Sequence, residues 1–401
     1  MTQPQERQQP LAGITVIDLS HVYNGPYATF LMAMAGARVI KVEPKGGEHL
    51  RSRGDAGGAA MAFAMLNSNK ESLTLNLKSE EGKGILRKLV AKADVLVENF
   101  APGVMERLEV GADALLQINP RLVYASSSGY GKDGPYKNYP AMDLVMQAMS
   151  GVIAITGYPD QPPVKSGPAV CDFAAGTHLY GAIITALFER ERTGKGRVVE
   201  VSMQDAIYAS MASNIGMNWA SGGKGPSRTG NRHGGLGISP YNVYATSDGY
   251  IVLNCPGDHH FRAALDVMGQ PELKDDPRFV SRSARVAHMF EVDELIEGWS
   301  KALPKQQVAQ LMLDAGVPCA PVRELGEVME DENMHARGSL QRITHPELGD
   351  VVLPHSPMRY EGNVQPALEP SHALGADNAA LLVELGYRPT DVQDLASTGV
   401  I

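Results

Sequence analysis

The chain has 401 residues, of which 43% are hydrophobic and 20% charged, and its formal net charge is -9. This length exceeds what a single hydrophobic core needs, so we expect two domains. The acidic balance disfavours a nucleic-acid partner, because proteins that bind DNA or RNA present a basic face to the phosphates.

The opening segment MTQPQERQQP is polar and has no apolar run before a small-residue cleavage site, so it predicts no secretory signal. No stretch approaches the roughly 18 apolar residues of a membrane span, which predicts no membrane partner. Cys171, Cys255 and Cys319 lie far apart without a CxxC pair, a spacing typical of neither a disulfide framework nor a zinc site. We therefore expect a cytoplasmic protein without a metal.

The first half of the chain alternates short β-branched runs with helical patterns. The expected strands are residues 13–20, 38–42, 94–99, 122–126 and 197–201. The expected helices are residues 26–37, 79–93, 144–155, 173–190 and 203–219. This alternation predicts an α/β fold with a doubly wound, Rossmann-like parallel sheet over residues 1–220.

The second half begins with a glycine-rich stretch over residues 221–240 that has no regular apolar period, which is typical of a linker or a flexible loop. A strand at residues 250–254 and helices at 261–268 and 305–315 follow it. We expect a smaller α+β domain over residues 241–330.

A G-x-G-x-x-G pattern occurs at Gly129, Gly131 and Gly134, directly after an expected strand. In a dinucleotide-binding fold, a helix would begin at the third glycine and receive the pyrophosphate. Pro135 and Pro140 follow instead, so the pattern does not indicate a dinucleotide site.

The chain does not match other common catalytic motifs. Gly194 and Lys195 are followed by Gly196 rather than by the Ser or Thr of a phosphate-binding loop, and no G-x-S-x-G is present. His259 and His260 are adjacent, so they cannot bind one metal from the same helix face. Nucleotide hydrolysis, serine-esterase chemistry and metal catalysis are therefore disfavoured.

Asp172 stands directly before an apolar helical pattern that contains Leu179, Ile183 and Leu187. One interpretation makes it the N-cap of that helix, whose side chain accepts a hydrogen bond from the first amides. The other makes it a nucleophile, which the helix dipole would hold ionised at neutral pH. The two interpretations are compatible.

Ten segments together resemble the family III CoA-transferases, the group of formyl-CoA:oxalate and carnitine CoA-transferases, which is related to α-methylacyl-CoA racemase. They run in order over nearly the whole chain: VIDL (16–19) with Gly25-Pro26, GARVIKVE (36–43), NSNK (67–70), DVLVENF (94–100) with Pro102-Gly103, NPR (119–121), GYG (129–131) with Gly134-Pro135, QAMSG (147–151), RTGKG (192–196), MQDA (203–206) and LGY (385–387). Each segment alone is a weak signal, and their order makes chance an implausible explanation.

The resemblance implies that Asp172 is the reacting carboxylate and that coenzyme A is a substrate, with no metal needed. Asp172 would attack an acyl-CoA thioester to give a mixed anhydride, and the CoA thiolate would then convert it to an aspartyl-CoA thioester. An incoming carboxylic acid would reverse these steps.

The resemblance also assigns the CoA contacts. Val22, Tyr23 and Asn24 would border the thioester end. The nucleotide would lie against Leu75 and Lys78, the pantetheine arm against Asn99 and Phe100, and the phosphates near Arg107. A solvent-exposed helix face is an equally good account of Lys78 and Arg107. The family's phosphate-binding base is replaced here by Pro44, which puts the arrangement of cations in doubt.

A glycine-rich loop covers the reaction site in this family, and Gly234, Gly235 and Gly237 are similar to it. A flexible linker is the other interpretation of this segment. Arg232 and His233 precede the glycines, where the formyl-CoA transferase loop has no such pair. They could hold the second carboxylate of a dicarboxylic acid such as oxalate, succinate, mesaconate or benzylsuccinate.

Two other functions stay open. Racemisation needs a second base opposite the aspartate, and the racemases have a histidine where this chain has Met142, which cannot transfer a proton. A non-catalytic acyl-CoA-binding subunit of a two-chain transferase would retain affinity for CoA without exchange activity.

The resemblance further implies an interlocked homodimer in which each chain forms a ring, with residues 331–401 returning to the large domain.

Overall fold

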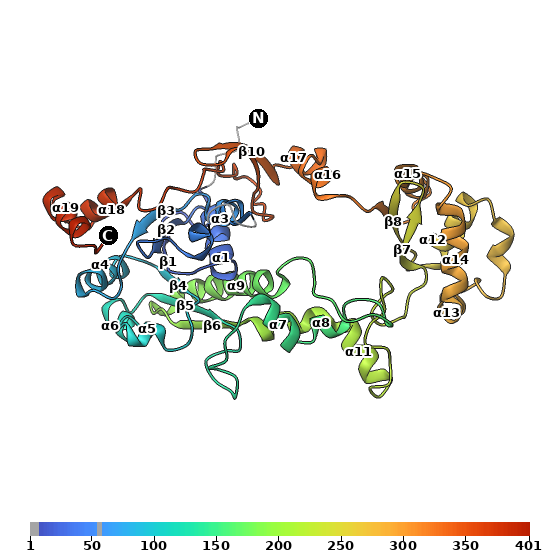
Figure 1. Ribbon diagram of the computed structural model, residues 1–401, viewed down its shortest axis with the longest axis horizontal. Helices are drawn as coiled ribbons and strands as arrows, with labels where there is room; N and C mark the ends of the chain where they lie inside the picture. The colour runs from blue at the N-terminus through green and yellow to red at the C-terminus, as the bar shows by residue number, and fades with distance from the viewer. Residues whose placement is uncertain (1–7, 54–57) are drawn as a thin grey trace. The chain divides into compact units, whose positions relative to one another are not determined.

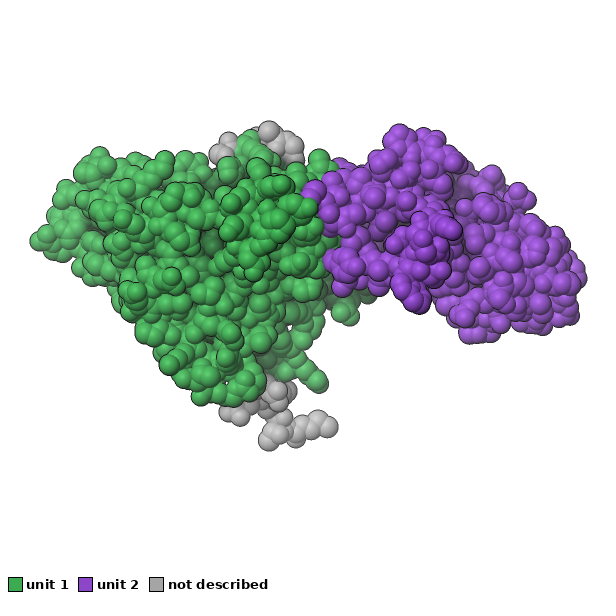
Figure 2. Space-filling view, turned by 90° about the horizontal axis from the view of Figure 1, so that it is seen from below, with its two compact units in different colours: residues 1–146, 169–207, 331–401 green, residues 147–168, 208–330 purple. Residues whose placement is uncertain are grey.

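The computed structural model describes residues 8–53 and 58–401, so the first seven residues of the polar opening segment lie outside the described residues. The chain forms two compact units, which Figure 2 shows in green and purple. Unit 1 comprises residues 1–146, 169–207 and 331–401, and unit 2 comprises residues 147–168 and 208–330. The expected large domain ran to residue 220, whereas residues 147–168 and 208–220 group with unit 2. Residues 331–401 group with unit 1.

A six-stranded parallel sheet forms the centre of unit 1 (Figure 1). The strands are β1 (Thr15–Asp18), β2 (Arg38–Glu43), β3 (Glu71–Thr74), β4 (Val95–Glu98), β5 (Val123–Ser128) and β6 (Val198–Ser202). Their order, β3-β2-β1-β4-β5-β6, is that of doubly wound nucleotide-binding folds, which bind ligands beyond the carboxyl ends of the strands. The predicted α/β class with a large parallel sheet is confirmed.

Helices cover both faces of this sheet. Those of the amino-terminal part are α1 (Asn24–Met34), α2 (His49–Ser52), α3 (Ala59–Asn67), α4 (Glu80–Val90), α5 (Val104–Arg107), α6 (Ala112–Ile118) and the long α9 (Val170–Thr193). Residues on α1, α3 and α9 share one apolar core with the sheet, and residues on α4, α5 and α6 share the other. Successive strand residues therefore serve opposite cores, as Val16 and Ile17 of β1 do.

The segment 331–401 completes unit 1. It forms α17 (Glu332–Ala336), the antiparallel pair β10 (Leu340–His345) and β11 (Gly349–Pro354), α18 (Asn378–Glu384) and α19 (Pro389–Ser397). Leu382 of α18 and the terminal Val400 and Ile401 are buried in the core beside α4. No helix or strand was expected in this segment from its sequence pattern.

Three expected helices differ from the observed ones. The expected helix 144–155 is two helices, α7 (Asp143–Met149) and α8 (Val152–Ile155), because Gly151 between them has a φ of 93°, outside the helical region. The expected helix 203–219 is divided into α10 (Met203–Tyr208), a 3-10 turn (Ala209–Met211) and α11 (Ala212–Ala220). α11 buries none of its residues, so little packing favours one continuous helix. The helix expected from residue 173 begins at Val170.

Unit 2 contains a small antiparallel sheet and its own core. Its strands are β7 (Tyr241–Thr246), β8 (Gly249–Asn254) and β9 (Cys319–Pro321). Besides α8 and α11, its helices are α12 (Asp258–Val267), the 3-10 helix η3 (Pro271–Asp275), α13 (Arg282–Ala287), α14 (Met289–Ser300), α15 (Lys305–Asp314) and α16 (Leu325–Met329). Leu253, Phe261 and Ile296 lie at the centre of its core.

Among the residues that the structure describes, α9 alone has the length and apolar composition that could cross a membrane. Leu179, Ile183 and Leu187 of α9 are buried in the core of unit 1 with α1 and the sheet. Such packing is that of the core helix of a globular unit.

Candidate active site

Asp172 is the third residue of α9, and its side chain is 9% exposed. The N-cap position belongs to Ala169, so the predicted N-cap role of Asp172 is wrong. Asp143, the first residue of α7, takes that role instead, because its Oδ1 accepts hydrogen bonds from the amides of Cys171 (2.9 Å) and Asp172 (3.1 Å). The carboxylate of Asp172 is thereby left available for other contacts.

The electrostatic environment of Asp172 differs from the expected one. Burial raises its pKa to about 7, and the neighbouring carboxylate of Asp143 adds to the increase. Burial and Asp143 thus act on this carboxyl group in the direction opposite to the helix dipole. A pKa near neutrality is typical of a carboxyl group in a functional site.

Asp172 lines a cavity of about 230 Å³ within unit 1. The cavity lies beyond the carboxyl ends of β1, β4 and β5, the position that doubly wound folds use for ligands. Its lining residues are His21, Val22, Asn24, His49, Asn99, Phe100, Ala101, Ser127, Ser128, Gly129, Ala141, Met142, Asp143, Asp172 and Met203.

Asn99 connects two of the loops that form this cavity. Its Oδ1 accepts from the amide of His21 (2.8 Å), and its Nδ2 donates to the carbonyl of His21 (2.9 Å) and to Oδ1 of Asn24 (3.1 Å). Val22, between these residues, has a φ of 64°, which is unusual for a β-branched residue. Its amide donates to Oε2 of Glu48 at 3.1 Å. Such strain is often found where a loop is shaped for a ligand.

A buried ion-pair network lies beneath the same loop. Nζ of Lys70 is 3.0 Å from Oδ2 of Asp18 and also donates to Thr29 Oγ1, Asn67 Oδ1 and the carbonyl of Pro26. Although burial opposes ionisation, Lys41 and Lys70 hold the pKa of Asp18 well below its usual range. The network explains two segments that the sequence analysis singled out, VIDL and NSNK, as supports of the loop after β1.

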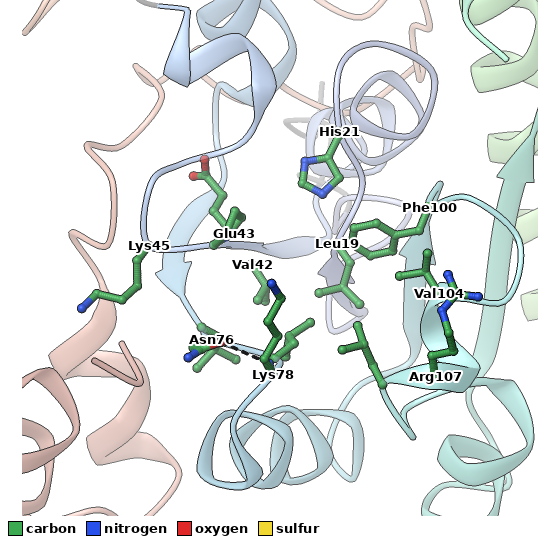
Figure 3. Close-up of a pocket in the computed structure, with 14 residues that line it drawn as sticks. Leu19, His21, Val42, Glu43, Lys45, Asn76, Lys78, Phe100, Val104 and Arg107 are labelled. Carbon is green, nitrogen blue, oxygen red and sulfur yellow. Dashed lines mark hydrogen bonds between the residues drawn. The ribbon is translucent and has the colours of Figure 1, made fainter. Parts of the chain in front are cut away.

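A second cavity of unit 1, of about 540 Å³, has apolar walls and a cationic rim (Figure 3). Lys45, Lys78 and Arg107 contribute the cations, and each side chain is exposed. The structure describes no ion pair to a carboxylate for any of the three. Leu19, Val42, Leu75, Leu77, Val104 and Leu108 form the apolar part of the wall. The cavity therefore suits a ligand with a flat or apolar body and several negative charges.

His21 and Phe100 line both cavities, so the two adjoin. Their rings meet edge to face with centroids 5.0 Å apart. Burial, together with Lys41 and His49, lowers the pKa of His21 to about 4, so its imidazole is neutral at physiological pH. The boundary between the two cavities is therefore formed by two uncharged rings, and an uncharged part of a ligand can lie against them.

The predicted CoA contacts thus fall into two groups. Val22, Asn24 and Asn99 line the Asp172 cavity. Leu75, Lys78 and Arg107 line the larger one, and Phe100 lines both. Tyr23 lines neither, and its ring stacks on Phe173 with the centroids 5.9 Å apart.

The glycine-rich segment belongs to unit 2. Gly234 borders a separate cavity of about 320 Å³, where an added side chain would collide with Asn214. His233 Nδ1 accepts from the amide of Gly235 at 3.2 Å. Arg232 donates to Oδ2 of Asp293 from Nε (2.8 Å) and Nη2 (2.6 Å), so its charge is already paired.

Sequence reasoning missed several lining residues. Lys45 follows Pro44, the position where the expected phosphate-binding base is absent, and it supplies a cation one residue later. His21, Asp143 and Ser127 were not predicted either. A strand end followed by polar residues was the available signal, since such ends meet at one edge of a parallel sheet.

Within residues 8–53 and 58–401, no group of three or more His, Cys, Asp or Glu side chains could hold a metal ion. The pattern Gly129-x-Gly131 leads into turns rather than a helix, and the next helix begins only at Asp143. The structure therefore agrees with the rejection of this pattern as a dinucleotide fingerprint.

The fold and the cavities define an α/β protein with a buried carboxyl group beside a cavity that has a cationic rim. The chain belongs to CoA-transferase family III, whose sequence model matches residues 11–378. It is 41% identical to an acetyl-CoA:oxalate CoA-transferase from Acetobacter aceti, over 96% of this chain and 97% of that protein. It is 36% identical to a formyl-CoA:oxalate CoA-transferase from Streptomyces avermitilis, over 98% and 99%.

A solved structure supports the same assignment. The crystal structure of a CAIB/BAIF family protein from Brucella suis matches with a TM-score of 0.83 and 33% identity, covering 94% of this chain and all of that one. The chain is accordingly an enzyme of the family III CoA-transferases.

Proposed function

We propose that this enzyme transfers coenzyme A from an acyl-CoA to a small dicarboxylic acid and that Asp172 carries the acyl group and then CoA. The observation that carries the proposal is the placement of Asp172 in a cavity that adjoins a cation-rimmed one. Two relatives at 36–41% identity are named for oxalate as acceptor, so oxalate is the first acid to test.

The reaction consists of four exchanges. A carboxylate oxygen of Asp172 bonds to the thioester carbon, and the C–S bond breaks to give a mixed anhydride and CoA thiolate. The thiolate attacks the aspartyl carbonyl, which releases the donor acid and leaves an aspartyl-CoA thioester. The acceptor carboxylate then displaces the thiolate to form a second anhydride. Finally, the thiolate attacks the carbonyl that the acceptor acid contributes to this second anhydride, which gives the new acyl-CoA and restores the carboxylate of Asp172.

The two cavities suggest how CoA lies along unit 1. The nucleotide occupies the larger cavity, with its phosphates near Lys45, Lys78 and Arg107. The pantetheine arm passes His21 and Phe100, and the thioester reaches Asp172. The apolar walls and exposed cations match the adenine and the phosphates of this ligand.

The raised pKa of Asp172 fits the same scheme. An aspartate without compensating cations is a more basic and less solvated nucleophile than one in water. The aspartyl anhydride must also be kept from water. We assign that task to the segment Gly234–Gly237 of unit 2, and the Arg232–Asp293 pair supports its base. His233 is the residue of this segment that we assign to the acceptor.

Assembly into an interlocked homodimer and a cytoplasmic location are further parts of the proposal. Each unit exposes a large apolar side chain, which is an argument for a partner chain that covers it: Phe188 is 65% exposed and Trp219 is 84% exposed.

The decisive experiment incubates the protein with acetyl-CoA or formyl-CoA and oxalate, and follows oxalyl-CoA by chromatography. Mass spectrometry of the peptide that contains Asp172 should detect a CoA adduct during turnover. Asp172→Ala should lower exchange by at least roughly 10⁴-fold, because the variant lacks the carboxylate that forms the intermediate. Exchange that persists in this variant would refute the assignment.

The same samples separate the two alternatives. A racemase would exchange the α-proton of a 2-methylacyl-CoA with deuterated solvent. We expect no such exchange, because Met142 in the cavity stands where the racemases have their histidine base. A non-catalytic subunit would bind CoA without producing oxalyl-CoA.

A further inference from the structure

Ser127 is a buried polar residue of the Asp172 cavity that the mechanism above does not use. It is the fifth residue of β5, its side chain is 1% exposed, and its hydroxyl has no hydrogen-bond partner in the described structure. A buried hydroxyl without a partner is costly, so it needs an explanation.

The register of β5 directs Ser127 toward the side of the sheet that holds α9. Side chains alternate along a strand, so Ser127 lies on the same face as Val123 and Ala125. Both of these residues belong to the core that α1 and α9 share. Tyr124 belongs to the opposite core, and Ser126 and Ser128 lie on its face. Ser127 and Asp172 thus line one cavity from two elements that face each other.

Three of the other polar side chains of this cavity do not offer a donor to a substrate oxygen. Asp143 and Asp172 contribute carboxylates, and Nδ2 of Asn99 already donates to His21 and Asn24. Oγ of Ser128 accepts from the amide of Gly131 at 2.9 Å, and its own hydrogen is not used by that bond. The reaction, in contrast, creates negative charge on a carbonyl oxygen at each exchange, beside these carboxylates.

We propose that the Ser127 hydroxyl donates a hydrogen bond to the acyl oxygen of the substrate as that oxygen becomes negative during attack by Asp172. This inference rests on the proposed function. When the aspartyl oxygen bonds to the thioester carbon, the π electrons of the carbonyl move to oxygen. The hydroxyl stabilises this oxyanion until the C=O bond re-forms and the C–S bond breaks. Ser127 keeps its proton throughout.

The first test measures kcat for CoA transfer in Ser127→Ala. Loss of one donor to an oxyanion should lower kcat roughly 10- to 100-fold, a larger factor than the accompanying rise in the KM for acyl-CoA. Ser126→Ala is the matched control, since Ser126 is 3% exposed on the same strand and faces the other core. We expect it to keep the wild-type kcat. Equal kcat in Ser127→Ala and the wild type, or an equal loss in both variants, would overturn the proposal.

The second test is binding, which does not depend on turnover. The probe is a ketone analogue of acetyl-CoA in which a methylene group replaces the thioester sulfur, and free CoA is the reference. Titration calorimetry should show weaker binding of the ketone to Ser127→Ala by about fivefold or more, with CoA affinity unchanged. Equal weakening of both ligands would mean that Ser127 only supports the fold, against the proposal.

The two proposals fail in different ways. If the wild type does not exchange CoA, the proposed function falls, and the ketone titration alone decides whether Ser127 contacts an acyl oxygen. If the wild type exchanges CoA and Ser127→Ala equals it, only the role of Ser127 falls.

Discussion

At the scale of single residues, the relation between Asp172 and Asp143 controls the site. Asp143 orders the start of α9 through two hydrogen bonds, and its charge adds to the increase that burial causes in the pKa of Asp172. A group that supports a helix end therefore also contributes to the proton affinity of the neighbouring carboxyl group. Asp172 must be ionised to attack a thioester, so this proton affinity governs the rate.

The raised pKa of Asp172 predicts how the rate of CoA transfer depends on pH. Asp172 is protonated below a pKa of about 7, so kcat/KM for acyl-CoA should rise with pH and level off above neutrality. Asp143→Asn keeps an oxygen for the amides of Cys171 and Asp172 but removes the charge. The rising limb should then move to lower pH by about one unit.

The measurement is a pH–rate profile of kcat/KM for the wild type, for Asp143→Asn and for a control variant. Asp113→Asn removes an exposed carboxylate of α6 and serves as the control, with no shift of the limb expected. A wild-type limb near pH 4, or one that Asp143→Asn leaves in place, would contradict the raised pKa or its cause.

At the scale of elements, α9 and α1 must approach closely for Asp172 to reach the cavity. Gly176 permits this approach, since a Cβ at that position would lie 2.5 Å from the carbonyl oxygen of Asn24. Asn24 lines the same cavity as Asp172. The packing of the two helices and the shape of the site therefore depend on one missing side chain.

Gly176→Ala should lower the free energy of unfolding by about 1–3 kcal/mol, because the added methyl group forces the helices apart. It should also lower kcat by displacing Asn24. Gly181→Ala is the matched control on the same helix, because a methyl group at that position would meet no atom within 4 Å. This control should stabilise the protein by about 0.5–1 kcal/mol through helix propensity. Urea unfolding and transfer assays measure both effects, and equal behaviour of the two variants would contradict the packing argument.

At the scale of the whole molecule, the net charge and the local charge have opposite signs. The chain carries a formal charge of -9, yet Lys45, Lys78 and Arg107 surround the larger cavity. An anionic ligand is therefore bound by a local group of cations on an acidic protein, and the attraction acts over a short range in physiological salt.

Lys45→Ala and Arg107→Ala should each raise the KM for acyl-CoA about 5- to 10-fold, with little change in kcat, because they remove contacts to phosphates far from the reacting carbon. The effect should shrink as salt concentration increases. Lys301→Ala, an exposed lysine at the end of α14 in unit 2 that pairs with Glu297, is the control. Steady-state kinetics at two salt concentrations test this prediction, and a KM that stays at the wild-type value would contradict the placement of the nucleotide.

The sequence alone determined the alternation of strands and helices, the parallel sheet, the family resemblance and the choice of Asp172. These features depend on local apolar periodicity and on short motifs that occur in a fixed order, and both can be recognised in the sequence itself. The fold class and the family are confirmed, and the role of Asp172 remains a prediction.

Only the tertiary structure decided which groups surround Asp172. Asp143 replaces it as the helix cap, Lys45 supplies a cation beside Pro44, and Ser127 lies opposite α9. The break at Gly151 and the unit boundary at residue 207 also escaped the sequence analysis. Most of these features depend on which strand ends meet and which helices touch, and such contacts join segments that lie far apart along the chain. A local pattern carries no information on them, because the packing of distant elements selects them.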